Sequence, residues 1–374
     1  MTSPGLAEQR AKGGGLRIGL VGAGGVARYA HLPAYRRLGL TVTAICDVDE
    51  AVAREVAAEF GVDAVVSRPE LLIGRDDVDV LDIATPPSTH ADLIVLFAQA
   101  GKPMLVQKPL CTTRAQFGQI TRVHARHDPW IRLNLTGRYV SAWRKVAALL
   151  AAGEIGRPFL CTIRNRDWWD RDPGRWDHEV ENYIVFEMLI HHLDLCRYWF
   201  GAPARVSARA GAHPRQLIRQ ANWITAMVEY QSPDVVQILE DWTMPEFSFA
   251  AGHPFEEVLI SGDRGVIRAT SERVELSVAG RNCQRVWHLP RPGQMLPGEQ
   301  LSTAWFPDSF GAAMSDFLCA VASGVGRADD WARLAGLTED TFAVSAAVTS
   351  DSWVECGQEA AQHSQSPPAG GKQP

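Results

Sequence analysis

Residues 102–110 read KPMLVQKPL, a short apolar run set between prolines. Met104–Val106 has the length and the bounding signals of a buried parallel strand, and Pro109 ends the pairing because proline has no N–H to donate. Gln107 and Lys108 therefore fall at the carboxyl end of this strand. Ligands bind at that edge of a parallel sheet, so Lys108 is a candidate site residue. A lysine at a strand end is more often a solvated surface group, and its neighbours decide between the two readings.

A glycine-rich turn near the N-terminus supplies that context. Leu16–Val21 reads as a short strand, and it runs into GAGGVA at residues 22–27, a GxGxxA pattern that opens a helix. Gly22 permits the tight turn, Gly24 lets backbone N–H groups approach a pyrophosphate, and Ala27 keeps the helix close to the strand. The predicted phosphate-binding residues are Gly22, Gly24, Gly25, Val26 and Ala27.

An acidic residue follows at the distance that a dinucleotide site requires. The second strand, Val42–Cys46, ends at Asp47, where a carboxylate accepts hydrogen bonds from the adenosine ribose. A 2′-phosphate would be repelled there, so the position favours NAD over NADP. The alternative is that Asp47 is only the N-cap of the helix predicted over 50–60. The complete strand–helix–strand unit favours the ribose role.

Composition limits the class of protein. A chain of 374 residues is expected to form two domains, and a formal charge of −6 gives no basic footprint for nucleic acid. The apolar runs are too short to suggest a membrane span. Residues 1–15 and 357–374, rich in Gly, Pro and Gln, read as disordered tails. The seven cysteines contain no CxxC pair and indicate a reducing compartment, so we expect a cytoplasmic protein.

The hydrophobic periodicity changes along the chain. From 16 to 137, apolar strands alternate with helical segments, which predicts an α/β domain with a parallel sheet. From about residue 157, strand-like runs joined by short turns predict a mostly antiparallel sheet. Two helices close the chain, and the first repeats Phe310, Met314, Phe317 and Val321 on one face.

Seven segments occur together in a recognisable order: GLVGAGGVA, ICDVD, ATPPSTH (84–90), GKPMLVQKPL, GEIGRP (153–158), EMLIHHLDLCRYWFG (187–201) and DSFGAAMSDFL (308–318). With them the chain resembles the glucose–fructose oxidoreductase / inositol dehydrogenase / rhizopine-catabolism (Gfo/Idh/MocA) family over most of its length. The resemblance implies an N-terminal Rossmann domain (16–137) and a C-terminal α+β domain (138–356) with a large open sheet. It also implies NAD or NADP, a sugar or polyol substrate in the cleft between the domains, and a homodimer or homotetramer formed through the open sheet.

The resemblance also assigns roles to individual residues. The family's Glu-Lys-Pro falls on Gln107-Lys108-Pro109, which places Lys108 near the nicotinamide and the substrate hydroxyl but replaces the acid by an amide. The family's Asp-x-x-x-His falls on Glu187 and His191, with one methylene added at the acid. Side chains four residues apart share a helix face, so Glu187 and His191 can reach one site. Further implied cofactor contacts are Thr85, Pro86, Pro87, His90 and Gln107.

Histidine is the natural proton acceptor near neutral pH, and His191 is the candidate catalytic base. The competing interpretation is that His191 and His192, on an apolar helix, are hydrogen-bonded core residues. A metal site at Glu187, His191, His192 and Asp194 is disfavoured, because adjacent histidines diverge and a third ligand at suitable spacing is lacking. We expect Asp194 to serve structure.

The substrate end is rich in tryptophan. The run 164–176 follows a strand, and indole faces beside Arg, Asn and Asp suit a polyol, which has apolar C–H patches and a rim of hydroxyls. The tryptophans could equally pin a loop or fill an interface between subunits. The candidate substrate-binding residues are Arg138, Arg164, Asn165, Arg166, Trp168, Trp169, Trp176, Tyr183 and His191.

These observations predict an NAD-dependent dehydrogenase or ketoreductase that moves a hydride between nicotinamide and a secondary carbinol of a sugar, cyclitol or sugar derivative. Two alternatives stay open. One is a glycoside-cleaving enzyme of the same family that oxidises its substrate transiently and eliminates the aglycone. The other is a non-catalytic dinucleotide-binding regulator, against which the retained Lys108 and His191 argue.

Overall fold

The structure is a computed structural model, and it describes residues 15–168, 170, 179–244, 255–280, 284–289 and 305–357. Nearly all of the two predicted tails, 1–15 and 357–374, lies outside the described residues. So do two of the candidate substrate contacts, Trp169 and Trp176.

The N-terminal domain is built on a six-stranded sheet in which every pair of neighbours runs parallel. Its order is β3-β2-β1-β4-β5-β6, so the chain runs outward from β1 and then crosses back to β4. Ligands bind where the strand order reverses, which places the site at the carboxyl ends of β1 and β4. The predicted parallel sheet is confirmed. The strands are β1 (Arg17–Val21), β2 (Thr41–Cys46), β3 (Ala64–Val66), β4 (Val80–Ile83), β5 (Met104–Val106) and β6 (Ile131–Leu133).

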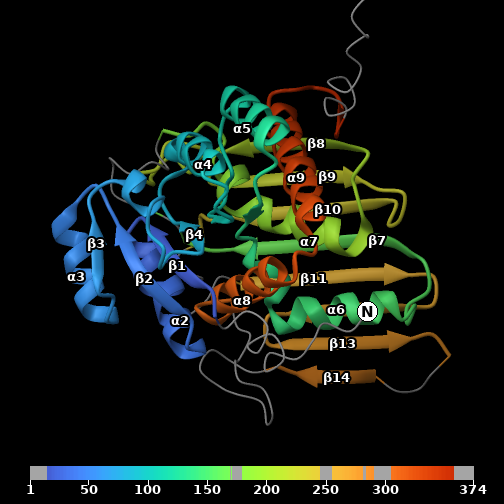
Figure 1. The fold of residues 1–374 in the computed structure, drawn as a ribbon. Coiled ribbons are helices and arrows are strands. Elements are labelled where there is room, and N and C mark those ends of the chain that lie inside the picture. Colours follow the sequence, from blue (N-terminus) through green and yellow to red (C-terminus); the bar gives the residue numbers. More distant parts are fainter. Residues whose placement is uncertain are drawn as a thin grey trace, which may run out of the picture.

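Helices lie on both faces of this sheet (Figure 1), and local sequence sets where they begin and end. The Asp49 side chain caps α3 by accepting from the amides of Ala51 and Val52. Thr113 and Gln116 form a reciprocal capping box at the start of α5. After a helical turn at Ala27–His31, the helices are α2 (Leu32–Leu38), α3 (Glu50–Phe60), α4 (His90–Gln99) and α5 (Arg114–His127).

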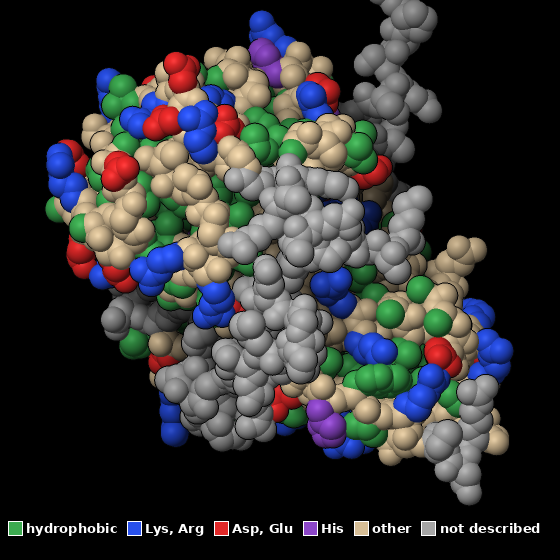
Figure 2. Space-filling model, turned by 60° about the horizontal axis from the view of Figure 1, so that its bottom comes forward, with side chains coloured by type: hydrophobic (Ala, Val, Ile, Leu, Met, Phe, Trp, Pro, Cys, Tyr) green, Lys and Arg blue, Asp and Glu red, His purple; other side chains and the backbone are tan. Residues whose placement is uncertain are grey.

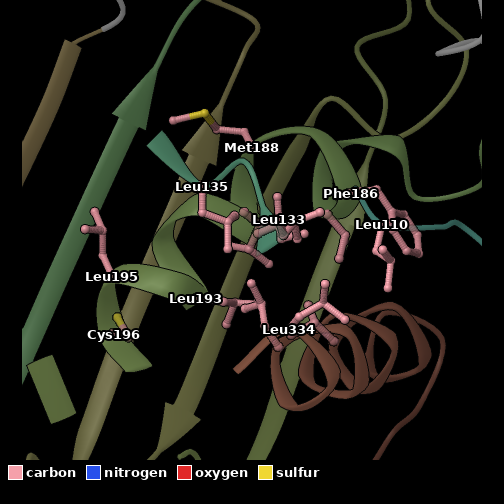
Figure 3. Packing of buried hydrophobic residues seen from close by; sticks show 14 of the residues in the cluster. Leu110, Leu133, Leu135, Phe186, Met188, Leu193, Leu195, Cys196 and Leu334 are labelled. Atoms are coloured by element: carbon pink, nitrogen blue, oxygen red, sulfur yellow. The ribbon is translucent and has the colours of Figure 1, made fainter. Parts of the chain in front are cut away.

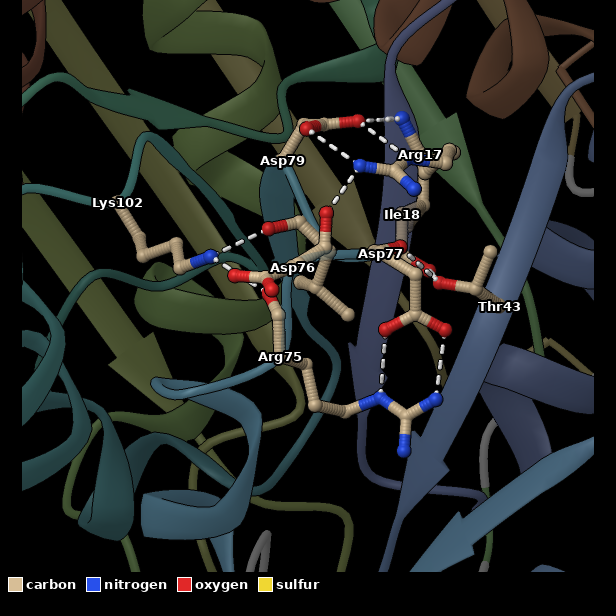
Figure 4. A network of polar contacts seen from close by, with 9 residues as sticks. Arg17, Ile18, Thr43, Arg75, Asp76, Asp77, Asp79 and Lys102 are labelled. Carbon is tan, nitrogen blue, oxygen red and sulfur yellow. Dashed lines mark hydrogen bonds and ion pairs between the residues drawn. The ribbon is translucent and has the colours of Figure 1, made fainter.

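Polar contacts tie the strands together at the amino-terminal edge of the sheet, opposite the site (Figure 4). The Arg17 amide and Nε donate to Asp79 Oδ2 at 2.8 and 2.9 Å. The Arg75 guanidinium forms a two-point bond with Asp77 at 2.8 and 2.6 Å, and Thr43 Oγ1 donates to the Asp77 carbonyl at 2.6 Å. This edge is braced by its own side chains, which leaves the opposite, carboxyl edge for ligands.

The C-terminal domain holds a nine-stranded sheet in the order β14-β13-β12-β11-β7-β10-β9-β8-β15. All described pairs are antiparallel except β7 with β10, so the predicted mostly antiparallel sheet is confirmed. Its strands are β7 (Pro158–Arg166), β8 (Arg205–Gly211), β9 (Trp223–Glu229), β10 (Val235–Asp241), β11 (Phe255–Gly262), β12 (Gly265–Thr270), β13 (Arg273–Val278), β14 (Gln284–His288) and β15 (Val354–Glu355).

One face of this sheet is covered by helices and the other is open (Figure 1). Along β7, Cys161, Ile163 and Asn165 are buried, whereas Leu160 and Arg164 are exposed. This alternation of buried and exposed side chains follows from the two-residue period of a strand. The helices of the C-terminal half are α6 (Ser141–Ala151), α7 (Ile190–Phe200), α8 (Asp308–Ser323) and α9 (Arg327–Ala347).

The two domains share one hydrophobic cluster (Figure 3). Leu110 and Leu133, from the end of the parallel sheet, belong to it together with Phe186 and Leu193, from the turn before α7 and from α7 itself. Leu334 of α9 closes the same cluster. This packing fixes the start of α7 against the strand end that carries Lys108.

The described surface is mixed in charge. On the face seen in Figure 2, basic and acidic side chains are interspersed, in keeping with the modest net charge of −6. Among the described residues, no helix is long and apolar enough to cross a membrane.

Candidate functional site

The glycine turn after β1 has the shape that a phosphate group needs. Gly22 has φ +98°, and a Cβ there would lie 2.8 Å from the Ala84 carbonyl oxygen, so only glycine fits. Gly24 has open space on its side-chain position, with nothing within 4 Å. Ala27 is fully buried and packs with Leu20, as a close contact between helix and strand requires.

Asp47 braces this turn from the end of β2. Its Oδ2 accepts from the Ala23 amide at 2.7 Å, and its Oδ1 accepts from the Asp49 amide at 2.9 Å. The N-cap of α3 is Asp49, so capping does not occupy Asp47. Each carboxylate oxygen keeps a lone pair for a further donor, and Arg54, one turn into α3, is engaged by Glu50. The glycine cradle and this carboxylate fit the phosphates and the adenosine ribose of a dinucleotide.

The loop after β4 forms the other wall of the turn. Thr85 Cγ2 lies 3.0 Å from the position of a Cβ on Gly22, and the Thr85 hydroxyl hydrogen-bonds Thr89 at 2.7 Å. Pro86 is exposed and Pro87 is buried. Thr85 and Pro86 thus line the predicted cofactor edge.

His90 does not lie at that edge. It is fully buried, its Nε2 lies 2.9 Å from the Thr85 carbonyl oxygen, and its Nδ1 lies 3.0 Å from that of Pro109. Both ring nitrogens thus face backbone carbonyl oxygens, and because burial lowers the pKa of the imidazole, the neutral ring donates to one of them at a time. We therefore correct the expected cofactor contact: His90 joins the two loops that border the site.

Lys108 reaches from the end of β5 across to the second domain. Its Nζ lies 2.8 Å from Glu187 Oε2 and donates to the Glu187 carbonyl oxygen at 2.9 Å. Both side chains are mostly buried, at 16% and 17% exposure, so this ion pair is shielded from screening by water and salt. Glu187 lies in the π-helical turn Val185–Leu189, directly before α7. The structure thus brings two of the three predicted catalytic residues into contact.

His191, the third, is the second residue of α7 and is 6% exposed. Its buried Nδ1 has no hydrogen-bond partner among the described residues. Burial, followed by the positive charges of Lys108 and His192, holds the pKa of His191 well below its ordinary value. The imidazole is therefore neutral at neutral pH, with the form of a proton acceptor.

His192 points away from His191 into the larger sheet. Its Nδ1 meets Glu240 and its Nε2 meets Glu256, each at 2.5 Å. Burial alone would lower the pKa of His192. The two carboxylates outweigh this effect and raise the pKa to about 10. Glu240 and Glu256 flank Asn165 on neighbouring strands, so His192 clamps α7 to the middle of the sheet. His192 is thus the hydrogen-bonded core histidine of the pair.

The aromatic residues Trp305 and Phe306, which lie beside His191, were not predicted as site residues from the sequence. The Trp305 and His191 rings pack edge to face, with centroids 5.3 Å apart and an interplanar angle of 82°. The Trp305 Nε1 donates to Thr136 Oγ1 at 3.1 Å. Phe306 stacks on Trp305 and also contacts Tyr29, in the helical turn after the glycines. The run WFPDSF before α8 carried an aromatic signal, but nothing in the sequence links position 305 to position 191.

The arginines of β7 do not accompany Asn165. Asn165 is fully buried on the helix-covered face, where its Oδ1 accepts from Trp242 Nε1 at 2.8 Å. Arg164 and Arg166 alternate with it and point to the open face. We therefore remove Arg164 and Arg166 from the proposed substrate contacts, because their faces are opposite to that of His192 and α7.

Three further candidates have other partners. Arg138 makes a two-point ion pair with Asp194 at 2.6 Å for both bonds, which matches the structural role expected for that acid. Tyr183 is fully buried against Trp242 at 6.0 Å. The Trp168 and His213 rings pack edge to face, with their centroids 6.3 Å apart. Arg138 and Tyr183 thus have partners within the protein, and substrate contacts by these residues and by Trp168 stay predictions.

Metal ligation has no support within the described ranges, where no group of three or more His, Cys, Asp and Glu side chains could hold an ion.

Comparisons with known proteins agree with this geometry. A family model described as "Oxidoreductase family, NAD-binding Rossmann fold" (GFO_IDH_MocA) matches residues 16–133, and the GFO/IDH/MocA C-terminal domain matches 143–268. D-apiose dehydrogenase of Paraburkholderia graminis is 30% identical over 50% of this chain and 51% of its own length. Inositol 2-dehydrogenase of Acidothermus cellulolyticus is 31% identical over 52% of this chain and 57% of its own. The chain thus spans little more than half the length of these relatives.

Solved structures share the fold over nearly the whole chain. Levoglucosan dehydrogenase in complex with NADH and levoglucosan has a TM-score of 0.78 and 20% identity, and covers 92% of this chain and 100% of its own. An oxidoreductase from Agrobacterium radiobacter in complex with NAD+, L-tartaric acid and magnesium has a TM-score of 0.78 at 21% identity. The match covers 92% of this chain and 99% of that structure's chain. At these identities the likeness extends to the fold alone.

Proposed function

The chain belongs to the GFO/IDH/MocA family of oxidoreductases with an NAD-binding Rossmann domain, as its motifs predicted, and from that membership we propose that it is an NAD-dependent dehydrogenase of a secondary alcohol in a sugar or cyclitol. Relatives named inositol 2-dehydrogenase and D-apiose dehydrogenase support this substrate class. The observation that carries the proposal is the contact of Lys108 with Glu187, one helical turn from His191.

Each of these side chains has a distinct part in the proposed reaction. Bound NAD supplies the acceptor for the hydride of the carbinol carbon. His191 takes the hydroxyl proton, and its neutral imidazole is ready to do so. Lys108 donates a hydrogen bond to the same oxygen and stabilises the negative charge that develops there. Glu187 holds the ammonium in place from the opposite domain.

A substrate screen tests the activity. Purified protein is mixed with NAD and a panel of inositols, aldoses, ketoses and 1,6-anhydrosugars, and with NADH and the matching keto compounds, while absorbance at 340 nm is followed. We expect NAD reduction with at least one polyol that has adjacent secondary hydroxyls. Release of an aglycone without net NADH would assign the glycoside-cleaving alternative instead. Tight NAD binding without turnover on any compound would assign the regulator.

Cofactor preference follows from Asp47. We expect kcat/KM with NAD to exceed that with NADP by about tenfold or more, a ratio that corresponds to about 1.4 kcal/mol. A 2′-phosphate would approach the carboxylate, and the Arg54 charge is already paired with Glu50. Asp47→Asn should narrow the ratio. Asp49→Asn, the same change two residues away at the N-cap, is the matched control and should leave it unchanged. Equal use of both cofactors by the wild type would remove the ribose role.

Trp305 gives a second test. Trp305→Ala should raise the substrate KM by about tenfold, because an aromatic ring is lost beside the proposed base His191. It should also move the acid limb of kcat/KM to higher pH, because burial is the main cause of the low His191 pKa. Trp305→Phe keeps an aromatic ring and loses only the hydrogen bond to Thr136. Its substrate KM should therefore lie between those of the wild type and of Trp305→Ala. An unchanged KM in both variants would show that Trp305 only packs the domain.

We propose a cytoplasmic homodimer or homotetramer that associates through the open face of the nine-stranded sheet. Large apolar side chains are exposed on its strands, among them Leu160, Trp223 and Met227, and a face of this kind is typical of a protein interface. Light scattering of the wild type and of a Met227→Asp variant tests the assembly, and identical monomer masses would contradict it.

A further inference from the structure

A buried polar network lies beneath the strand end that carries Lys108, and no step proposed above uses it. It joins Gln107 with His31, Tyr35 and Asp82, which come from the helical turn after the glycines, from α2 and from β4. His31 and Asp82 are fully buried, and Gln107 is 5% exposed. Away from water, each donor in such a network must face an acceptor, so the geometry constrains the protons.

The first constraint is the orientation of the Gln107 amide. Its Oε1 accepts from the backbone N–H of Lys108 at 3.0 Å. The flipped amide would set NH₂ against N–H, two donors facing each other, so this backbone bond fixes the orientation. The amide nitrogen of Gln107 therefore faces His31 Nε2, at 2.7 Å.

The second constraint is the position of the His31 proton. An amide nitrogen only donates, so Nε2 of His31 must accept through its lone pair. The single ring proton is then on Nδ1, which lies 2.7 Å from Asp82 Oδ2. The Tyr35 hydroxyl donates to the same oxygen at 2.7 Å, and the Phe310 ring of α8 lies 5.0 Å from the imidazole. The donors and acceptors around His31 thus match a neutral imidazole with its proton on Nδ1.

We propose that Gln107 is a positioning residue: it locks His31 in the neutral Nδ1–H tautomer, and the locked network holds the backbone of Lys108. The family resemblance places a glutamate at this position. A carboxylate there would meet Nε2 as acceptor against acceptor, unless His31 bound a second proton. The amide of Gln107 and a neutral His31 therefore belong together in this chain. The inference rests on the proposed function only for the role of Lys108.

The tautomer can be observed without turnover. The full chain is labelled with ¹⁵N-histidine, and His31 is assigned by its contacts with the Phe310 ring and by its loss in His31→Gln. For the wild type near pH 7 we expect one protonated nitrogen, Nδ1, and one bare nitrogen, Nε2. In Gln107→Glu both nitrogens should be protonated, since a carboxylate then faces each of them. A charged or Nε2–H wild-type ring, or an unchanged neutral ring in Gln107→Glu, would overturn the proposal.

Kinetics test the positioning. Gln107→Met keeps the length of the side chain and removes both hydrogen bonds, so we expect kcat to fall about tenfold or more, while the dissociation constant of NAD changes less than twofold. Gln99→Met, the same substitution at the exposed last residue of α4, is the matched control and should leave kcat unchanged. An unaltered kcat in Gln107→Met would refute the positioning role even if the tautomer is as described. If the wild type turns over no substrate, the proposed function fails, and the NMR comparison still decides the tautomer.

Discussion

Replacing His191 with Asn is expected to lower kcat/KM for alcohol oxidation by about 10²–10⁴, the contribution that a positioned acid–base group usually makes. Asparagine retains polarity and approximate size but cannot take a proton near neutral pH. The buried Nδ1 of His191 has no hydrogen-bond partner among the described residues, and the positive charge of Lys108 acts on the same imidazole. Steady-state rates of wild type and variant across pH make the measurement.

The pH dependence has a definite sign. A base must be unprotonated, so wild-type kcat/KM should be lost as pH falls through the His191 pKa and should be flat above it. Burial, then Lys108 and then His192, hold that pKa well below the ordinary histidine value, so the acid limb should lie below the usual histidine range. His191→Asn should abolish the limb. A wild-type limb centred above neutrality would contradict the assigned environment.

His192→Asn is the matched control, with the same substitution one residue along the same helix. It removes the cation between Glu240 and Glu256 and leaves two buried carboxylates together. Loss of one partner of a buried charge cluster costs about 3–5 kcal/mol, so unfolding should shift far more than turnover. Should His192→Asn abolish turnover while His191→Asn retains it, the catalytic role would belong to the other histidine.

Much of the fold followed from local pattern. The strand–turn–helix at GLVGAGGVA, the acid at position 47 and the short apolar run at 104–106 each have a short-range cause, and the structure places all three at the carboxyl edge of one parallel sheet. Of the expected helix face, Phe310, Met314 and Phe317 are likewise buried, and Val321 is half-buried against the same cluster. These features depend on residues close in sequence, so local patterns predict them.

The faces of strand β7 show where pattern fails. Its end reads RNR at 164–166, and three consecutive polar residues give no apolar alternation from which to choose the buried one. The choice is made by β10 and β11, which set Glu240 and Glu256 beside Asn165 beneath His192. Those partners lie 75 and 91 positions away in the chain, and sequence spacing carries no record of the contact.

Two further features had weak signals of their own. Asp82 stands in the apolar strand VLDI, and a buried carboxylate always needs donors, which predicts an unseen partner without naming His31 or Tyr35. Trp305 follows residues 290–304, which lie outside the described ranges, and it meets His191 only through the fold. Long-range packing, not local propensity, completes the site.

Replacing Lys108 with Ala is expected to cost at least as much as the loss of His191, about 10²–10⁴ or more in kcat/KM, while NAD binding stays nearly intact. The ammonium stabilises charge on the reacting oxygen, whereas the glycine turn and Asp47 hold the dinucleotide. Because Lys108 and His191 act on one oxygen, the double variant should be far less impaired than the product of the two single effects. A loss of NAD affinity as large as the loss of rate would contradict this assignment.

The Lys108 variants also test the electrostatics of the site. The lysine charge is one cause of the low His191 pKa, so its removal should move the acid limb of Lys108→Ala to higher pH. Lys108→Arg keeps the positive charge but not the compact ammonium that the Glu187 carboxylate and carbonyl hold. It should therefore leave the acid limb of kcat/KM at the wild-type pH and still lower kcat/KM. Glu187→Gln keeps a hydrogen-bonding shape and should lose less than Lys108→Ala. If the limb of Lys108→Ala stays where the wild type has it, Lys108 and His191 do not share one site.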